Sequence, residues 1–284
     1  PNTPLISTSV LLVLFVFGIG KAAIMPFHRW LPAAMVAPTP VSALLHAVAV
    51  VKAGVFSVLK VAVYIFGLDL LAQLPTADFM LYLAGATVLL SSLVAMRKDN
   101  LKARLAYSTV SQLSYITIGA LLATSAGIVG GAMHIAMHAF GKITLFFCAG
   151  AIMVAAHKTE ISDMRGLGRK MPVTMTAFFI GSLSIIGLPP TGGTWGKWFL
   201  MVGAFDAGEL TIMVILMISS LLNIAYLLPI PLRGFFSGET PQEKVTIREA
   251  PLPSLVAICI TASGCIALFF FTQPLYELAL AILQ

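Results

Sequence analysis

Long apolar runs, separated by short polar segments, make up most of the chain. Each run is close to the length of about 20 residues that a helix needs to cross a bilayer. The pattern predicts an all-α, polytopic membrane protein with about eight transmembrane spans, forming a single membrane domain over residues 1–284. We expect the spans at roughly 5–25, 40–66, 79–96, 104–125, 128–156, 172–206, 210–232 and 254–271. A final amphipathic segment after Pro274 is expected to lie at the membrane surface or to extend the last helix.

Composition supports a membrane protein. The chain is 59% hydrophobic and only 10% charged, with a mean hydropathy of +0.98, whereas a typical soluble domain carries about 25% charged residues. The net charge of +6 does not require a nucleic-acid partner, because cytoplasmic loops of membrane proteins are basic for topological reasons. Three cysteines lie in apolar runs and are interpreted as small core residues, so no disulfide or metal site is predicted.

Two of the predicted spans are interrupted by proline and glycine. The first runs into "MPFHRWLPAAM" and the sixth contains "GLPPTGGTWGK". Proline and glycine release backbone groups from their helical partners, which at membrane depth is tolerated where the backbone is buried in protein or lines a water-filled cavity. We therefore predict two broken helices of the kind that marks transport sites. The residues expected to form the breaks are Pro26, Pro32, Pro189, Pro190, Gly192 and Gly193.

The loops indicate an orientation. With Arg29, the segments 97–104, 157–170 and 233–250 hold twelve of the 17 lysines and arginines. The alternating loops around Asp69–Asp78 and Asp206–Glu209 hold none. All the basic loops fall on one side if every span crosses once, and the positive-inside rule makes that side cytoplasmic.

The remaining five cationic residues lie inside apolar spans, and all five are lysines: Lys21, Lys52, Lys60, Lys142 and Lys197. A lysine at the bilayer centre costs about 2.5–3.5 kcal/mol even on the lenient insertion scale. Snorkelling to the interface could account for one of them, such as Lys60. Burial favours the neutral form of a lysine, whereas arginine stays charged. The choice of lysine therefore indicates groups that gain and lose a proton.

Histidines accompany these lysines. His134, His138 and Lys142 are spaced i, i+4 and i+8, which places three titratable groups on one helix face. We interpret this stripe as a proton relay, the alternative being a helix interface where each histidine bonds to a neighbour. On the second span His46 and Lys52 are six residues apart and point to different faces.

The fourth span carries a weaker polar signal in "LAYSTVSQLSY". Tyr107, Ser111 and Gln112 could line a wet path, or they could simply bind helices together. The pattern does not separate these two interpretations.

Four stretches resemble one protein family: "KAAIMPFHRWLPAAMVAPTPVSALLHAVAVVKAGVF", "NLKARLAYSTVSQLSY", "HIAMHAFGKITLFF" and "GLPPTGGTWGKWF". They are similar, in this order, to signature stretches of the antiporter-like subunits. These are the large proton-channel subunits of NADH–quinone oxidoreductase (respiratory complex I) and the D-type subunits of Mrp cation/proton antiporters. Membrane-bound hydrogenases carry relatives, and the resemblance spans nearly the whole chain.

The resemblance implies a fold of fourteen transmembrane helices built from two inverted five-helix repeats, each with one broken helix. By this resemblance the chain is a C-terminal fragment, in which 1–66 ends the first repeat, 67–232 forms the second and 233–284 is the C-terminal helix region. The relay implied by the resemblance comprises Lys21, His46, Lys52, His134, His138, Lys142 and Lys197. The family pairs the lysine corresponding to Lys21 with a glutamate two helices earlier, which this sequence does not contain. Many relatives also have aspartate where this chain has Ala33.

The resemblance implies translocation of H⁺, alone or together with Na⁺, by one subunit among other membrane subunits in the cell inner (plasma) membrane, coupled to NADH–quinone or related electron transport. One alternative is a D-type subunit of an Mrp Na⁺/H⁺ antiporter, without redox chemistry. Another is a non-conducting structural subunit. The chain has no dinucleotide fingerprint, P-loop or nucleophile elbow, so no catalytic site or cofactor of its own is predicted.

Overall fold

The computed structural model describes residues 5–44, 48–237 and 246–283. Regular structure in these ranges is helical, apart from one isolated bridge between Asn100 and Glu160. A π-helix, Val61–Phe66, continues α4. The helices are α1 (Leu5–Gly18), α2 (Trp30–Ala33), α3 (Thr39–Ala43), α4 (Val50–Lys60), α5 (Leu68–Leu71), α6 (Pro75–Arg97), α7 (Leu101–Leu121), α8 (Ser125–Ala156), α9 (Leu167–Lys170), α10 (Pro172–Ile186), α11 (Gly193–Asp206), α12 (Leu210–Leu227), α13 (Pro229–Phe236), α14 (Leu252–Phe270) and α15 (Gln273–Leu280).

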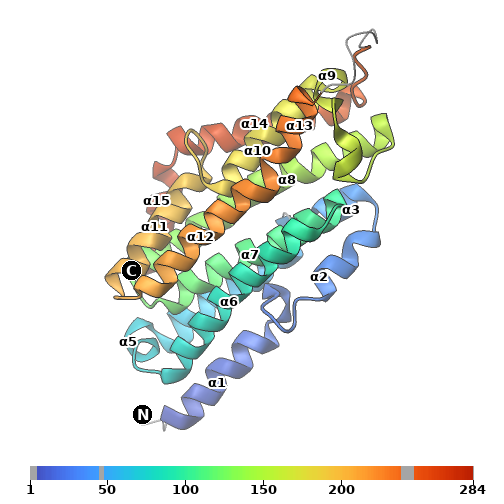
Figure 1. Cartoon of the computed structure of the whole chain (residues 1–284). Helices are drawn as coiled ribbons and strands as arrows, with labels where there is room; N and C mark the ends of the chain where they lie inside the picture. Colours follow the sequence, from blue (N-terminus) through green and yellow to red (C-terminus); the bar gives the residue numbers. More distant parts are fainter. Residues whose placement is uncertain (1–4, 45–47, 238–245, 284) are drawn as a thin grey trace.

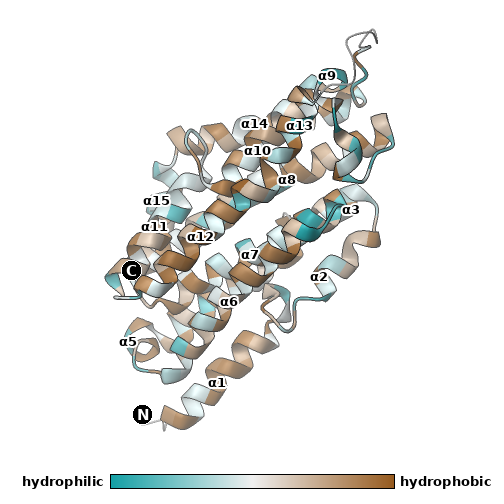
Figure 2. Cartoon of the chain, viewed as in Figure 1, coloured by the Kyte–Doolittle hydropathy of each residue, from teal (hydrophilic) through white to brown (hydrophobic). Residues whose placement is uncertain are grey.

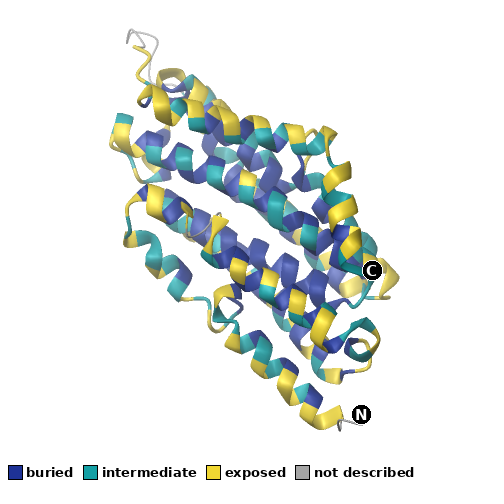
Figure 3. Cartoon of the chain, turned by 180° about the vertical axis from the view of Figure 1, so that it is seen from behind, coloured by how far each residue is buried: buried dark blue, intermediate teal, exposed yellow. Residues whose placement is uncertain are grey.

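The long helices run roughly side by side, with both chain ends at the same end of the bundle (Figure 1). The centre is formed by α7 and α8. Helix α8 packs against α7, α10, α11 and α14, while α7 packs against α6 on its other side. Residues 108–121 of α7 are all buried, and dark blue marks this interior in Figure 3. Helix α1 lies at the edge of the bundle, where it contacts α6.

The outer surfaces of the bundle are apolar, and brown segments follow most helices in Figure 2. Four helices of the described chain are long and apolar enough to cross a membrane: Pro75–Arg97, Ser125–Ala156, Leu210–Phe236 and Leu252–Phe270. Shorter apolar helices, such as Leu5–Gly18 and Pro172–Ile186, accompany them. The expected all-α, polytopic membrane protein is confirmed, whereas the number of crossings stays a prediction. The described part of run 40–66 is divided into shorter helices, and run 172–206 is divided into two, α10 and α11.

The first interruption follows α1. A 3₁₀ turn at Gly20–Ala22 leads to Ala23, which has a φ of 56°, and to a cis peptide bond before Pro26. Pro32 lies inside the short helix α2. The Trp30 side chain spans the break, because its Nε1 donates to the Gly20 carbonyl at 3.0 Å.

Helix α4 can approach this break closely because residue 54 is glycine. A Cβ at Gly54 would lie 2.4 Å from the Lys21 carbonyl carbon and 2.6 Å from the Ala22 nitrogen. These are backbone atoms, which cannot rotate away. The absence of a side chain at Gly54 therefore fixes how close the break lies to α4.

The second interruption separates α10 from α11. Helix α10 ends at Ile186 and is followed by Gly187, whose φ of 88° favours glycine. Pro189 and Pro190, joined by a cis peptide bond, and Gly192 then lead to Gly193, the first residue of α11.

Helix α14 and the segment before it hold this broken helix at three points. The Glu249 carboxylate accepts from the backbone nitrogens of Val173 and Thr174, at 2.7 and 3.3 Å, and so caps the start of α10. Within the break, the Gly192 nitrogen donates to the Cys265 carbonyl at 2.9 Å. At the start of α11, Trp195 Nε1 donates to the Phe269 carbonyl at 3.1 Å.

The basic loops meet at one end of the bundle, which confirms the expectation that they share a side. The Leu101 nitrogen donates to the Thr159 carbonyl at 2.9 Å, which joins loop 97–104 to loop 157–170. The Arg248 nitrogen donates to the Lys170 carbonyl at 2.8 Å, which adds the third basic segment. At the other end, the Tyr82 hydroxyl donates to Glu209 at 2.7 Å.

Gly193→Ala tests the packing of the second break. A Cβ at this position would lie 1.8 Å from the Ser184 carbonyl oxygen, so α10 and α11 would have to separate. We expect a loss of stability of at least about 3 kcal/mol, the upper range for overpacking. Denaturant titration of the detergent-solubilised protein, followed by circular dichroism, measures it. Gly18→Ala is the matched control, because no atom lies within 4 Å of its added Cβ. Equal stability of the two variants would contradict the described approach of α10 to α11.

Candidate functional site

Five titratable side chains converge inside the bundle. Lys52 comes from α4, His134, His138 and Lys142 come from α8, and Lys197 comes from α11; their exposed fractions are 7%, 1%, 1%, 0% and 5%. No aspartate or glutamate of the described residues is buried. The three lysines therefore lie in the interior without a buried carboxylate beside them, although a buried charge normally needs a partner.

The expected stripe on α8 is present. The imidazole rings of His134 and His138 have centroids 5.9 Å apart and an interplanar angle of 28°. Lys52 Nζ reaches across from α4 and is hydrogen-bonded to Nδ1 of His138. One turn further along α8, Lys142 Nζ donates to the Ser108 hydroxyl at 2.6 Å and to the Leu105 carbonyl at 3.0 Å, both on α7.

Lys197 owes its partners to the second break. Its Nζ donates to the Ile186 carbonyl at 2.9 Å and to the Ser220 hydroxyl at 3.2 Å, and it lies 4.8 Å from the centroid of the Tyr115 ring. The Ile186 carbonyl belongs to the last turn of α10, where carbonyl groups have no partner within the helix and carry partial negative charge. The break therefore supplies the buried amine with a dipole in place of an acid.

A glycine places Lys197 next to the histidine stripe. A Cβ at Gly196 would lie 3.1 Å from both the Cα and the Nδ1 of His134, so the absence of a side chain at this position favours the close approach of α11 to α8. The preceding break sets the direction in which α11 leaves the turn. Lys197 consequently lies beside α8, although it is 63 positions from His134 in the sequence.

Several buried polar atoms in this region have no hydrogen-bond partner. His134 Nε2 donates to Gln112 Oε1 at 3.0 Å, which leaves His134 Nδ1 and Gln112 Nε2 unpartnered. His138 Nε2 is also unpartnered. Such atoms are rare in protein interiors unless water or a ligand serves them. The centre of the bundle is therefore more polar than a packed helix interface requires.

The weaker polar residues of α7 lie in two different places. Ser111 and Gln112 are fully buried in the same region, and Ser111 lies 3.1 Å from the hydroxyl of Ser92 on α6. Tyr107 is only half-buried and lies toward the first break, with its ring centroid 6.2 Å from that of His28.

Two of the five lysines are not buried. Lys21 is exposed in a pocket of about 520 Å³ at the bundle edge, together with Trp30 and Val50. Lys60 is exposed on α4, with Nζ 5.8 Å from the centroid of the Phe56 ring. No described element covers these two side chains. The exposure of Lys60 agrees with the expectation that it could snorkel to the interface. A relay role for Lys21 stays a prediction, and His46 lies outside the described residues.

Sequence reasoning missed a set of polar residues on α12. Ser219, Asn223 and Tyr226 are buried at 0%, 0% and 1% exposure, and the Tyr226 hydroxyl donates to Asn223 Oδ1. Their i, i+4 and i+7 spacing places them on one helix face. The spacing can be read from the sequence, but three uncharged polar residues in an apolar span are a weak indication of a functional site.

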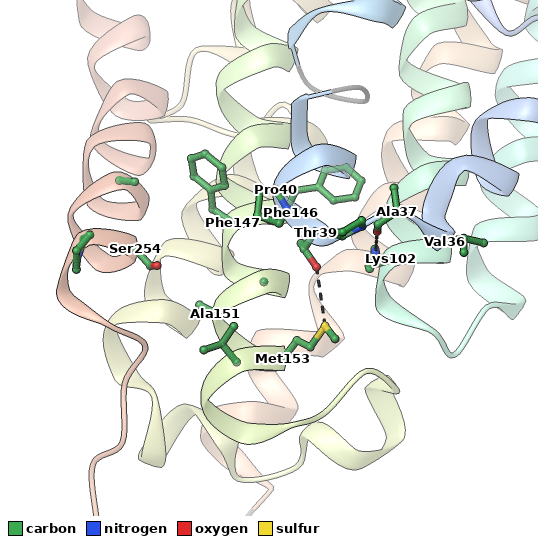
Figure 4. Close-up of a pocket in the computed structure, with 15 residues that line it drawn as sticks. Val36, Ala37, Thr39, Pro40, Lys102, Phe146, Phe147, Ala151, Met153 and Ser254 are labelled. Atoms are coloured by element: carbon green, nitrogen blue, oxygen red, sulfur yellow. Dashed lines mark hydrogen bonds between the residues drawn. The ribbon is translucent and has the colours of Figure 1, made fainter.

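A separate pocket of about 740 Å³ opens at the basic end, between residues 36–40, α8 and the start of α14 (Figure 4). Its walls are mostly apolar, with side chains such as Phe147 and Met153. Lys102 lies at its edge, where Nζ donates to the Ala37 carbonyl at 2.7 Å. None of the buried lysines or histidines lines this pocket, so it is distinct from the titratable cluster.

Comparison with known proteins shows which family shares this arrangement. Residues 2–223 match the family model described as NADH:quinone oxidoreductase/Mrp antiporter, transmembrane. The chain belongs to this family. It is a membrane antiporter-like chain of the complex I/Mrp type, as the resemblance predicted.

Relatives and solved structures agree with the family. The chain is 32% identical to NADH-quinone oxidoreductase subunit N of Desulforudis audaxviator, over 96% of this chain and 57% of the relative. It is 36% identical to subunit L of Rickettsia conorii, over 87% of this chain and 36% of the relative. The chain thus spans about half or less of these relatives.

Among solved structures, the fold resembles a chain of the Mrp complex from Dietzia sp. with a TM-score of 0.87 at 23% identity, over 96% of this chain and 58% of that one. It also resembles a chain of respiratory complex I from Thermus thermophilus, with a TM-score of 0.77 at 21% identity and the same two coverages. At these identities the likeness concerns the fold.

Lys142→Met tests whether the buried amine is there for stability. Replacing a buried charge by an apolar side chain of similar length is often neutral or stabilising, so we expect stability to fall by no more than about 1 kcal/mol. Denaturant titration in detergent measures the change. The control is Leu145→Ala, one turn along α8 and equally buried, which should lose about 2–5 kcal/mol. A loss at Lys142 as large as that of the control would show a structural role.

Proposed function

We propose that this chain carries a proton-translocating relay of an antiporter-like subunit in a multi-subunit membrane complex. The observation that supports it is the set of three buried lysines and two buried histidines, brought together from α4, α8 and α11 with no acid buried among the described residues. Without a compensating carboxylate, three like charges in a low-dielectric interior repel one another. The most stable arrangement then has fewer protons than amines, so a proton can move from one amine to the next.

The geometry supports proton movement along the length of the bundle. Lys52 is hydrogen-bonded to His138, which lies one turn from both His134 and Lys142 on α8. Histidine can accept a proton on one ring nitrogen and release one from the other. The unpartnered ring nitrogens of His134 and His138 are available for this exchange. Lys197, held by the end of α10, is the last buried amine of the series.

We further propose that the complete protein has the fourteen-helix fold of two inverted repeats. The present chain would supply about eight crossings with its basic loops in the cytoplasm, in the inner (plasma) membrane. The supporting observation is that the basic loops share one end of the bundle. Lys21 is exposed at the edge of the described chain, and in this arrangement a further membrane segment would cover it and complete its part of the relay.

Coupling to NADH–quinone electron transport is the preferred assignment, because relatives at 32–36% identity are NADH-quinone oxidoreductase subunits N and L. The partners are then the other membrane subunits of that complex. The second candidate is a subunit of an Mrp-type Na⁺/H⁺ antiporter, which the fold similarity to an Mrp complex favours. A non-conducting structural subunit is the third, and it would tolerate loss of the lysines.

The test is transport by the full-length protein in its native complex. Lys52→Ala, Lys142→Ala and Lys197→Ala are each expected to abolish proton uptake by membrane vesicles while the complex still assembles, because each removes an amine that must hold the proton in turn. Lys21→Ala should behave in the same way if that residue joins the relay. Lys60→Ala is the control among the membrane lysines, since Lys60 is exposed and outside the cluster.

The driving force separates the candidates. Proton uptake on addition of NADH supports redox coupling, whereas uptake or release that responds to a sodium gradient alone supports the antiporter. Near-normal proton and sodium flux in all three variants of the buried lysines would refute the relay and favour the structural subunit.

A further inference from the structure

A second polar column lies beside the histidine stripe. It is formed by one face of α12, where Ser219, Ser220 and Asn223 are followed by Tyr226, and by Ser108 on α7. Four of these five residues are buried, and Ser220 is half-buried. The column contains hydroxyl and amide groups and no charged residue. It is therefore chemically unlike the lysine and histidine series beside it.

Both ends of this column meet a buried lysine. At one end Lys197 Nζ donates to the Ser220 hydroxyl at 3.2 Å. At the other end Lys142 Nζ donates to the Ser108 hydroxyl at 2.6 Å. Ser108 lies one turn along α7 from Arg104, whose Nη1 donates to the Tyr226 carbonyl at 3.1 Å, so this part of α7 faces Tyr226. The column thus begins and ends at the same two amines that the histidine stripe connects.

The middle of the column holds polar atoms without partners. The Tyr226 hydroxyl donates to Asn223 Oδ1, which leaves Asn223 Nδ2 unpartnered. One turn away, Ser219 Oγ is unpartnered as well. A helix-joining role would leave these groups bonded across the interface, because an unsatisfied buried polar group costs about 1–3 kcal/mol. The unpartnered atoms are instead the arrangement expected of a site that holds water.

The column does not open to the basic surface. Beyond Tyr226 lies Arg104, whose Nη1 donates to the Tyr226 carbonyl at 3.1 Å and whose Nε donates to the Lys98 carbonyl at 2.8 Å. A fixed guanidinium is a barrier to protons and cations in a narrow path. Arg104 therefore closes the column on this side, and its connections are the two lysines.

We propose that the Ser108–Tyr226–Asn223–Ser219 column is a second proton route between Lys142 and Lys197, parallel to the histidine stripe. This inference rests on the proposed function and adds a route to it. A proton leaves Lys142 Nζ for the Ser108 hydroxyl, which passes its own proton to the Tyr226 hydroxyl or to a bridging water. The same exchange continues through water held by Asn223 and Ser219 and through the Ser220 hydroxyl, until a neutral Lys197 Nζ takes up one proton. Every hydroxyl is neutral before and after, and one positive charge has moved from Lys142 to Lys197.

Two routes in parallel give a distinctive pattern of losses. The experiment uses the full-length protein in its complex and measures the initial rate of proton uptake by membrane vesicles. The variant Tyr226→Phe with Asn223→Leu keeps the packing volume of α12 but removes the polar groups. We expect its rate to fall by about three- to tenfold, and His134→Leu alone, which interrupts the stripe without touching the partner of Lys52, to have a partial effect. The combination of all three substitutions should abolish uptake.

Controls separate a proton route from a structural role. Ser114→Ala removes a buried hydroxyl of α7 that only bonds its own helix, at 3.2 Å to the Val110 carbonyl, and should leave the rate unchanged. Ser219→Ala should lower the rate and Ser219→Thr, which keeps the hydroxyl, should restore it. This pair also serves if the α12 double variant fails to assemble, because a single methyl-sized change is tolerated more readily.

The outcomes distinguish this proposal from the function on which it rests. Wild-type rates in the α12 double variant and in Ser219→Ala, with uptake lost in Lys142→Ala and Lys197→Ala, would overturn the second route and leave the relay standing. Equal loss with Ser219→Ala and Ser219→Thr would also overturn it, because packing would then be the cause. Normal uptake in the lysine variants would overturn the relay itself.

Discussion

The structure depends on amines that are buried, in the part of the chain that the structure describes, without an acidic residue buried beside them. In water an ammonium group is stabilised by hydration, and inside the bundle that stabilisation must come from fixed dipoles. Lys142 finds a carbonyl and a hydroxyl on α7, and Lys197 finds the carbonyl end of α10. None of these partners carries a full charge, so they lower the energy of the ammonium form without making it permanent. Charge switching needs such an intermediate degree of stabilisation.

The broken helices follow from the same requirement. An unbroken transmembrane helix uses all its central carbonyls internally and has none to offer to a lysine. Ending α10 at Ile186 releases a carbonyl at the depth where Lys197 lies, and Gly187, with its positive φ, lets the chain turn away. The glycine at 196 then brings α11 against His134. Local irregularity of the backbone thereby becomes a set of hydrogen-bond acceptors inside the membrane domain.

Much of this could be predicted from the sequence, and the reasons differ between residues. The stripe of His134, His138 and Lys142 follows from helical periodicity alone, and the position of the second break follows from its prolines and glycines. The exposure of Lys21 could not be predicted, because an apolar helix face looks the same whether lipid or protein covers it. Nor does periodicity show that the lysine after the break reaches back to the Ile186 carbonyl, since that contact depends on the angle between α10 and α11.

Glu249 and helix α14 determine where movement can occur. The carboxylate of Glu249 binds the start of α10, the Cys265 carbonyl binds the turn within the break, and the Phe269 carbonyl binds Trp195 at the start of α11. Both halves of the discontinuous helix are thus bonded to α14 or to the segment that precedes it, and these contacts oppose hinge motion at the break. Movement of the Lys197 amine then depends on its side chain. Rotation about its four methylene groups can carry the nitrogen from one acceptor to another while the backbone stays in place.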